Sequence, residues 1–592
     1  MDIEERESLY VDESRRLTGP NLFFAETGAV LEALGPASHT LAAHHRWRHY
    51  VEHLAIALGW HATLCVARAH EASTSLVVSA PFDQLLTATE VNEWAWETAT
   101  AELHPELSVS NAFNGAPNDI DDVQAAITRL RAKAALERND HLGSLIATAR
   151  EQRLSVLLDD ETFSVGGGNG AGSWPLAKLP SAVEFERQLS ELHNIPTAIV
   201  TGSNGKTTTV RLIAAMADAA GMQPGYSCTE GVFVAGQQTF SGDYSGPAGA
   251  RSVLRDGRVG CAVLETARGG VLRRGLAVSR ADVAVVTNIS ADHFGEYGID
   301  NLDDLADAKL VVARAIGGIG DSGVLVLNAE DPVLMRRSSH FGLKAAVFAG
   351  GPQNIHVLAA RAAGRSVCTV ESGRIVLFHN NVVSDLGAIT QMPLTCGGAA
   401  AYNVANIMAA SLAAAALGIA SELIAKALAN FGATRFDNPG RLEQWNIGGV
   451  HVLLDYAHNP AGLAGLMRVA NALQATTGGR IGLLLGQAGN REDDDVKALA
   501  RMAAQCAPDR IILKDIDGML RGRSPGEVPV LLHAALLGAG FDTQRISTLL
   551  PELDAAKQLF AWAVAGDVVV VPMHGIAPRV AIRQWLDGGA VG

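Results

Sequence analysis

Short apolar runs separated by amphipathic stretches recur along much of the chain. The runs of strand length are residues 197–201, 261–265, 283–288, 323–328, 450–454, 480–485, 510–514 and 568–571. Strands that alternate with helices are typical of mainly parallel sheets. The pattern therefore predicts an α/β fold with a central, mainly parallel sheet and a second, C-terminal doubly wound unit.

The sequence before residue 196 is organised differently. Residues 44–60 and 88–103 have helical patterns, and residues 62–67 and 73–79 are strand candidates, so residues 1–125 predict a small α/β domain. Residues 166–173 are rich in glycine and precede Trp174-Pro175, which is typical of a flexible linker. We therefore expect residues 126–195 to be a linker or the remnant of a lost domain, residues 196–436 a central domain and residues 437–592 a C-terminal domain. Within the central domain, residues 345–395 contain strand-like runs such as 355–358 and predict an inserted lobe.

Composition narrows the class of protein. A chain of 592 residues is too long for one core, and 48% hydrophobic with 18% charged residues is typical of a folded, soluble protein. A net charge of −15 argues against nucleic acid and anionic membranes as partners. The six cysteines form no C-x-x-C pair, which argues against a cysteine-based zinc site and fits a reducing compartment. The first residues are charged and do not form an apolar signal sequence. The Ala-rich run 409–420 is too short to span a bilayer. We expect a cytoplasmic protein.

The strongest chemical signal lies at residues 201–209, which read Thr-Gly-Ser-Asn-Gly-Lys-Thr-Thr-Thr. An apolar strand precedes this string and a helix pattern follows it. Glycines let the backbone curl around an anion, and the helix N-terminus adds a positive dipole. A lysine reaches the β- and γ-phosphates, and the next hydroxyl can hold Mg²⁺. The expected phosphate-binding residues are Gly202, Ser203, Asn204, Gly205, Lys206, Thr207 and Thr208.

Polar residues follow the next three strands of the central domain. Glu265 ends one strand, a second leads to Asp292-His293, and a third leads to Glu330-Asp331. Ligands of parallel sheets bind at the carboxyl ends of strands. A carboxylate and an imidazole at neighbouring strand ends predict Mg²⁺ sites around a triphosphate.

A second candidate site lies in the N-terminal domain. His49, Glu52 and His53 form the H-x-x-E-H order of zinc hydrolases and share one face of a predicted helix. Two histidines do not make a zinc site, and no third ligand is obvious in the sequence. The ordinary alternative is a helix with polar residues on its solvent face.

Six strings together resemble the Mur ligases, and most closely the Mur-ligase-like module of cyanophycin synthetases. They occupy residues 201–209, 265–270, 292–295, 438–442, 455–460 and 520–527, in the family's order and spacing. Residues 19–21 and the helix with His49 also resemble the first domain of those synthetases. The synthetases carry an ATP-grasp domain between the two parts, and residues 119–174 are too few to form one. The resemblance implies a central P-loop ATPase domain and a Rossmann-like C-terminal domain.

The resemblance also implies a chemistry and roles for named residues. The family activates a carboxylate as an acyl phosphate with ATP and Mg²⁺, and then joins it to an amine. Lys206, Glu265, His293 and Lys309 become the expected catalytic residues, with Thr207, Glu265 and His293 as Mg²⁺ ligands and Lys309 as a possible carbamylated lysine. Asn403 and Asn406 become adenine-side contacts, while Arg441, Asp455 and His458 line the nucleotide cleft from the C-terminal domain. Arg268 and Arg251 are candidates for binding a substrate carboxylate.

Three functions remain open from the sequence. The first is a ligase that joins an amino acid, arginine being the expected one, to an aspartate side-chain carboxylate of a peptide. The second is a catalytically weak partner of a full-length synthetase, and the third is an N-terminal zinc peptide hydrolase. The resemblance suggests a dimer or tetramer.

Overall fold

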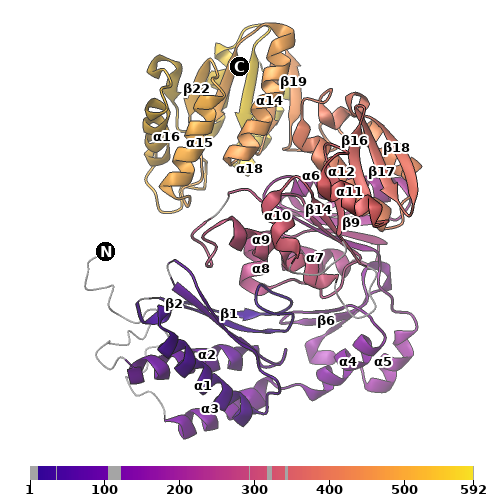
Figure 1. Ribbon diagram of the computed structural model, residues 1–592, viewed down its shortest axis with the longest axis vertical. Helices are drawn as coiled ribbons and strands as arrows, with labels where there is room; N and C mark the ends of the chain where they lie inside the picture. The colour runs from indigo at the N-terminus through magenta and orange to yellow at the C-terminus, as the bar shows by residue number, and fades with distance from the viewer. Residues whose placement is uncertain are drawn as a thin grey trace.

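The computed structural model describes residues 11–34, 36–71, 73–103, 122–291, 294–316, 323–339 and 345–590. Its strands form a four-stranded, an eleven-stranded and a six-stranded sheet, together with a small three-stranded sheet. Figure 1 shows the three large sheets following one another along the longest axis, with the N-terminal sheet at one end and the C-terminal sheet at the other. Fold class and the α/β character predicted from the sequence are confirmed.

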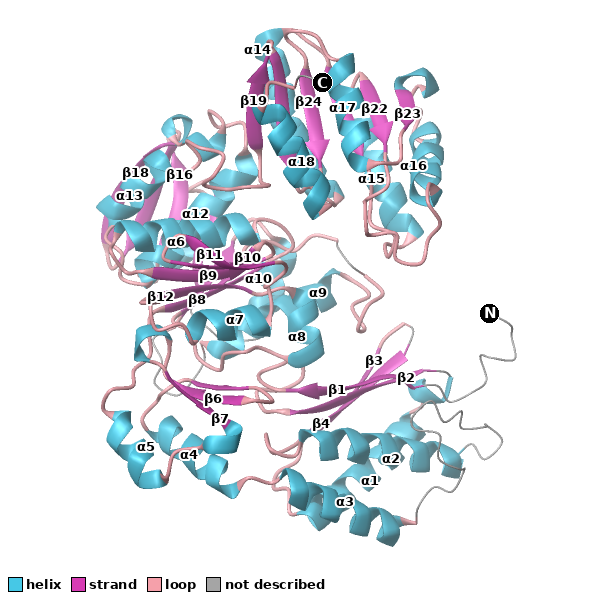
Figure 2. Ribbon diagram, turned by 180° about the vertical axis from the view of Figure 1, so that it is seen from behind, coloured by secondary structure: helices cyan, strands magenta, loops and turns pink. Residues whose placement is uncertain are grey.

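The N-terminal unit is an antiparallel sheet in the order β1-β2-β4-β3 with helices on one face. Its elements are β1 (Val11–Leu17), β2 (Gly28–Leu34), α1 (Leu41–Leu58), β3 (Cys65–Ala69), β4 (Ser73–Ser79), α2 (Leu85–Leu103) and α3 (Val123–Glu137). Trp47 and Trp96 are buried between the helices and the sheet. Figure 2 shows α1, α2 and α3 on the outer face, while the other face is turned toward the central domain.

Residues 140–189 form a folded unit, which includes the glycine-rich segment 166–173 that was expected to be a flexible linker. Its elements are α4 (Asp140–Glu151), β5 (Val156–Leu158), β6 (Thr162–Val165), β7 (Gly172–Pro175) and α5 (Ala182–Leu189). Phe163, Trp174 and Phe185 pack their rings together, with Phe163 and Trp174 stacked at 5.6 Å between centroids. Backbone hydrogen bonds join the glycine-rich turn to His193, from Gly167 N to His193 O and from His193 N to Gly170 O. Composition predicted flexibility here because it does not show these aromatic and long-range backbone contacts.

The central sheet has seven parallel strands in the order β9-β12-β8-β13-β14-β15-β16, with an antiparallel pair at each edge. Its strands are β8 (Thr197–Thr201), β9 (Pro224–Cys228), β10 (Gly231–Val234), β11 (Gln237–Ser241), β12 (Cys261–Glu265), β13 (Val283–Val286), β14 (Val324–Asn328), β15 (Ala345–Ala349), β16 (Val367–Glu371), β17 (Arg374–His379) and β18 (Val382–Ala388). Residues 345–388 therefore continue the main sheet and do not form a separate lobe. The segment expected to be a strand at 355–358 is the start of a helix.

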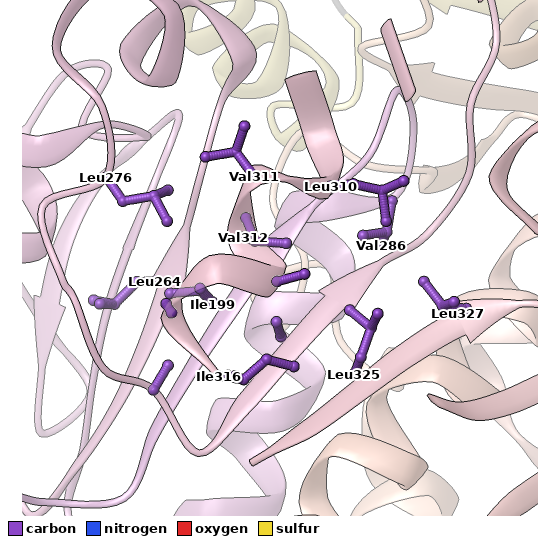
Figure 3. Packing of buried hydrophobic residues seen from close by; sticks show 14 of the residues in the cluster. Ile199, Leu264, Leu276, Val286, Leu310, Val311, Val312, Ile316, Leu325 and Leu327 are labelled. Atoms are coloured by element: carbon purple, nitrogen blue, oxygen red, sulfur yellow. The ribbon is translucent and has the colours of Figure 1, made fainter. Parts of the chain in front are cut away.

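Helices cover both faces of this sheet. They are α6 (Lys206–Ala219), α7 (Pro247–Leu254), α8 (Arg268–Arg274), α9 (Leu302–Leu310), α10 (Pro332–Ser338), α11 (Ile355–Ala362), α12 (Ala401–Ala416) and α13 (Ser421–Asn430). One buried cluster joins the sheet to α6, α12 and α13, and the other joins it to α7–α11. Figure 3 shows part of the second cluster, where Ile199, Leu264 and Val286 pack under residues 310–316. Each such side chain contributes roughly 1.5–3 kcal/mol by burial, which fixes the strands whose ends carry the polar residues.

The C-terminal domain is a second doubly wound sheet in the order β19-β20-β24-β21-β22-β23, parallel except for β19. Its elements are β19 (Glu443–Ile447), β20 (Val450–Asp455), α14 (Pro460–Thr477), β21 (Ile481–Leu485), α15 (Asp493–Gln505), β22 (Arg510–Leu513), α16 (Glu527–Gly538), β23 (Ile546–Thr548), α17 (Glu552–Trp562), β24 (Val568–Pro572) and α18 (Ile576–Asp587). Helices α14–α16 cover one face and α17 and α18 the other. Within the described ranges, none of the helices combines the length and apolar character that a membrane span requires.

The aromatic cluster of residues 140–189 generates a first prediction. Phe163→Ala removes a fully buried ring, which typically costs about 3–5 kcal/mol, so residues 152–195 open more often. Limited proteolysis at native conditions then cuts this segment faster than in the wild type. Val183→Ala in the same unit is the control, because Val183 is 67% exposed and its loss leaves the cleavage rate unchanged. Rapid cleavage of the wild-type segment would instead support a flexible linker.

Candidate active site

A large cleft of about 1140 Å³ opens where the three large domains meet. The central domain lines it with residues 203–208 and with the first turns of α12, and the C-terminal domain lines it with residues just before β19 and just after β20. The N-terminal domain adds Glu32 and His70. Most of the site residues expected from the sequence line this cavity.

The loop between β8 and α6 has the conformation that the sequence predicts. Gly205 precedes the first turn of α6 with φ 84°, in the left-handed region. A Cβ at this position would lie 2.1 Å from Asn406 Oδ1, so only glycine fits. Lys206 Nζ donates to the carbonyls of Gly202 at 3.0 Å and Ser203 at 3.2 Å, which places its charge over the curled loop. A cation above a helix N-terminus is the arrangement that binds phosphate.

The residues that follow β13 hold this loop in place. Thr287 Oγ1 donates to the Asn204 carbonyl at 2.6 Å, and Asn204 N donates to Asn288 Oδ1 at 3.0 Å. Ser203 Oγ donates to the carbonyl of Ser290 at 3.0 Å. The loop is thus pre-formed by the neighbouring strand, so little ordering is needed when an anion binds.

Thr207 and Glu265 meet beside the loop. Thr207 Oγ1 donates to Glu265 Oε2 at 2.8 Å. Thr207 lies in the first turn of α6, which follows β8, and Glu265 ends β12, the strand next to β8. Burial raises the pKa of Glu265, and the Lys206 ammonium opposes this rise. Mg²⁺ prefers carboxylate and hydroxyl oxygens and needs only one or two protein ligands when phosphates supply the others. This donor set fits a magnesium ion, which would also compensate the buried carboxylate.

Of the two other expected catalytic residues, His293 and Lys309, the structure describes only Lys309. His293 lies outside the described residues, so its place relative to Glu265 stays a prediction. Lys309 lies in the last turn of α9, is buried with 5% of its surface exposed, and lines the cleft. Lys309 is therefore not a surface lysine.

Asn403 and Asn406 lie in the first turns of α12 at the wall of the cleft. Asn403 Nδ2 donates to the Leu394 carbonyl at 2.9 Å, and Asn406 Nδ2 donates to Asn403 Oδ1 at 3.2 Å. The chain of amides fixes the orientation of Asn406 against Gly205. The structure thereby brings both residues to the phosphate-binding loop.

The C-terminal domain reaches the loop through its own polar residues. Arg441 Nη2 lies 3.4 Å from Thr207 Oγ1, and its guanidinium stacks 4.5 Å from the centre of the Tyr456 ring. Asp455 accepts from Leu442 N at 2.7 Å, and burial raises the pKa of Asp455 although Arg441 opposes this. His458 also lines the cleft.

Two further contacts across this interface involve asparagines. Asn459 Nδ2 donates to Asn204 Oδ1 at 3.0 Å, and Asn438 Nδ2 donates to Thr208 Oγ1 at 3.1 Å. The C-terminal side therefore touches the phosphate-binding loop and the first turn of α6 directly. Binding at the loop and the position of the C-terminal domain are physically coupled.

Glu230, which sequence reasoning missed, joins the same parts. Its carboxylate lies 2.9 Å from Arg211 of α6, 3.2 Å from Arg579 of α18 and 3.8 Å from Arg441. Burial by itself would raise the pKa of Glu230, but the three guanidinium groups outweigh it and lower the pKa. One acid thus holds cations from the phosphate-loop helix and from the C-terminal domain. No local motif marks Glu230, because its partners lie up to 349 positions away.

The two arginines expected to bind a substrate carboxylate are separated by the structure. Arg268 opens α8 and lines the cleft, with Nη2 2.5 Å from Glu296 Oε2. Arg251 lies on α7 and its Nε is 3.5 Å from Asp159 Oδ2 in the unit of residues 140–189. It is not among the residues that line the cleft, so only Arg268 keeps its expected place.

The H-x-x-E-H helix gains no metal site from the structure. His49, Glu52 and His53 are exposed on α1, on the helical side of the N-terminal sheet. In the part of the chain that the structure describes, no group of three or more His, Cys, Asp or Glu side chains could hold a metal ion. The ordinary reading of a polar helix face accounts for this pattern.

Comparison with known proteins finds cyanophycin synthetases among the relatives of this chain. Cyanophycin synthetase of Synechocystis sp. is 38% identical over 343 residues, which cover 58% of this chain and 38% of that protein. The cyanophycin synthetase of Trichormus variabilis is 37% identical over 388 residues, which cover 66% of this chain and 42% of that protein. The chain thus spans less than half the length of these relatives. A folylpolyglutamate synthase of Mycobacterium tuberculosis, solved with ADP and AMPPCP, has 18% identity and a TM-score of 0.47, covering 66% of this chain and 90% of that chain.

Two family matches cover the central and C-terminal domains. Residues 200–414 match the Mur ligase middle domain, and residues 440–572 match the Mur ligase glutamate ligase domain. The matched ranges contain the phosphate-binding loop, Glu265, the asparagines of α12 and the cleft residues just before β19 and just after β20. Through these two domains the chain belongs to the Mur ligase family.

Proposed function

We propose that this protein is an ATP-dependent, ADP-forming ligase that joins a carboxylate to an amine of an amino acid. The observation that carries the proposal is the Thr207–Glu265 pair beside a pre-formed phosphate-binding loop. Family membership and the names of the relatives support the reaction class. The cleft is large enough for a nucleotide and two further substrates, because ligand pockets of ordinary size have roughly 300–1,000 Å³.

The proposed reaction has two steps. An oxygen of the acceptor carboxylate attacks the γ-phosphorus of ATP, the bond to the β–γ bridging oxygen breaks, and ADP leaves. The amine then attacks the carbonyl carbon of the acyl phosphate, loses a proton, and expels inorganic phosphate. Lys206 and the loop amides hold the β- and γ-phosphates, so catalysis depends mainly on positioning and charge.

Magnesium supplies neutralisation of the phosphate charge when it is bound. Thr207 and Glu265 are the proposed ligands of a first ion, and His293 of a second. Lys309 is a candidate for carbamylation, which would convert its ammonium into an anionic ligand at the buried end of α9. Dependence of activity on bicarbonate would test that modification. Asn403 and Asn406 are the proposed adenine-side contacts, and Arg441, Asp455 and His458 contact the nucleotide from the C-terminal side.

The proposed substrates are arginine and an aspartate side-chain carboxylate of a peptide. The similarity to cyanophycin synthetases is the support for this pair. Arg268 lines the cleft, and we propose that it binds the acceptor carboxylate. Asp243 is a carboxylate in the cleft that suits a guanidinium group. Asp515 lies nearby in sequence to the cleft residues Ile516 and Met519, but it is buried and accepts from Gly526 N at 2.8 Å.

The direct test is ADP release with each common amino acid, with and without β-Asp–Arg peptides. We expect release that requires both an amine and a carboxylate acceptor, with arginine giving the highest rate. Lys206→Ala lowers kcat by about 100-fold or more, because it removes charge stabilisation in the transition state. A folded wild type that releases no ADP with any pair would favour the alternative of a partner subunit without catalysis.

Nucleotide binding has a separate, sharper test. Gly205→Ala places a methyl group against Asn406 Oδ1 and abolishes nucleotide binding measured by calorimetry. Gly221→Ala is the matched control at the other end of α6, because its φ of 73° is similar but nothing lies within 4 Å of the added Cβ. The control pays only the conformational cost, about 1–2 kcal/mol, and binds nucleotide normally. Equal binding by both variants would contradict the proposed loop.

Acceptor recognition distinguishes the two arginines. Arg268→Ala raises the KM for the carboxylate acceptor by about tenfold or more, because a charged hydrogen bond contributes about 1.5–3 kcal/mol. The KM for ATP stays near the wild-type value. Arg251→Ala is the control, since Arg251 is outside the cleft, and leaves both constants unchanged. If the Arg251 variant alone raised the acceptor KM, the acceptor site would have to be placed elsewhere.

A further inference from the structure

All three large domains meet at residues 294–300, which connect the end of the β13 region to α9. On the central side, Glu296 Oε2 pairs with Arg268 at 2.5 Å. On the C-terminal side, Asn490 Nδ2 lies 3.5 Å from Glu296 Oε1. Glu296, Tyr297 and Gly298 all line the cleft. This connection therefore belongs to the proposed active site, and whatever holds it in place influences Arg268.

The N-terminal domain packs against the same connection. The Arg15 guanidinium stacks 4.7 Å from the centre of the Tyr297 ring. Gly298 has φ 66°, and a Cβ there would lie 2.5 Å from His70 Cδ2 and 2.9 Å from Arg68 Nη1. The N-terminal β3–β4 hairpin thus packs directly against the backbone at Gly298.

The Arg15 and His70 side chains are themselves fixed by Glu32. Arg15 Nη2 donates to Glu32 Oε1 at 2.7 Å, and His70 Nε2 lies 3.3 Å from Glu32 Oε2. Burial by itself would raise the pKa of Glu32, but His70, Arg15 and Ser75 outweigh it and lower the pKa to about 2. The carboxylate is therefore charged at neutral pH. Arg15, Glu32 and His70 form a hydrogen-bonded network that makes this surface of the N-terminal domain rigid.

The same hairpin also fixes the start of α9. Arg68 Nη2 pairs with Asp304 Oδ1 at 2.7 Å, and both side chains are more than three-quarters covered. Glu71 N donates to Asp300 Oδ2 at 2.7 Å, and Asp300 N donates to Asp304 Oδ2 at 3.2 Å. Helix α9 carries Lys309 into the cleft, so these contacts set the position of that lysine.

A second anchor holds α8, the helix that Arg268 opens. Thr18 N donates to the Arg274 carbonyl at 2.8 Å, and Leu276 N donates to the Pro20 carbonyl at 2.7 Å. Figure 2 shows α8 and α9 directly above the sheet of β1–β4. Helices α8 and α9, which bring Arg268 and Lys309 to the cleft, are therefore both attached to the N-terminal domain.

We propose that the N-terminal domain is a positioning element of the ligase site, which aligns Arg268 and Lys309 through the Arg68–Asp304 pair and the packing on residues 297–298. The kinetic consequence of this inference rests on the proposed function. The contacts of the N-terminal domain with residues 297–298 and α9 can be tested without measuring activity. Arg68 is a positioning residue, because it acts through α9 and does not line the cleft. Misplacement by about 1 Å can cost up to 100-fold in rate, so a modest shift of α9 is sufficient to matter.

The test compares three variants of the full chain. Arg68→Ala lowers kcat/KM for the carboxylate acceptor by about tenfold, while the affinity for nucleotide stays within about twofold because β13 and the C-terminal domain hold the phosphate loop. The double variant Arg68→Asp with Asp304→Arg restores most of the loss by rebuilding the pair in reverse. Arg46→Ala is the control, since Arg46 pairs with Glu102 inside the N-terminal domain and its loss changes neither constant.

Hydrogen–deuterium exchange separates this inference from the proposed function. Residues 294–310 exchange faster in Arg68→Ala than in the wild type or in Arg46→Ala, whether or not ligase activity has been found. An inactive wild type with this exchange pattern would contradict the ligase proposal but would still support the conclusion that the N-terminal domain holds residues 294–310 in place. Unchanged exchange in Arg68→Ala, or an acceptor kcat/KM equal to that of the wild type in a folded variant, would overturn the inference.

Discussion

The register of three adjacent parallel strands is the constraint on which the site depends. Glu265 of β12 is paired with Val200, and Val286 of β13 is paired with Thr201, so the three chain segments leave the sheet side by side. Because side chains alternate between the faces of a sheet, a slip of one residue would turn Glu265 to the opposite face. The buried cluster around Ile199, Leu264 and Val286 prevents such a slip. Packing far from any ligand thereby sets the 2.8 Å contact between Thr207 and Glu265.

The electrostatics of the cleft differ from those of the whole chain. The protein carries a net charge of −15, yet Lys206, Lys309, Arg268 and Arg441 all face the same cavity. Local cations therefore supply attraction for anionic substrates that the overall charge does not. Two carboxylates near this cleft have opposite pKa shifts: burial raises the pKa of Glu265, whereas the guanidinium groups of Arg211, Arg441 and Arg579 lower the pKa of Glu230. The first suits a metal ligand, and the second suits a permanent ionic contact between domains.

The three domains contact the site in different ways. The C-terminal domain touches the phosphate loop through Asn459 and Arg441, which is the type of contact that responds to domain closure. The N-terminal domain contacts α8 and α9 and thus the side of the cleft away from the phosphate loop. The cleft is therefore an assembly of three surfaces, and none of its walls is complete within one domain. This arrangement gives the small N-terminal domain a physical relation to the chemistry, although its H-x-x-E-H helix faces away from the cleft.

The sequence by itself determined the phosphate loop, the polar strand ends and the alternation of strands and helices, because each depends on residues close together in the chain. Residues 201–209 carry their own turn, cation and helix start, and their local chemistry predicts their structure. Tertiary structure alone decided that Arg268 reaches the cleft while Arg251 pairs with Asp159, that residues 345–388 continue the main sheet, and that residues 140–189 fold. It also decided the roles of Glu230 and Arg68. Their partners lie hundreds of positions away, and no local pattern encodes which distant surface a charged side chain will meet.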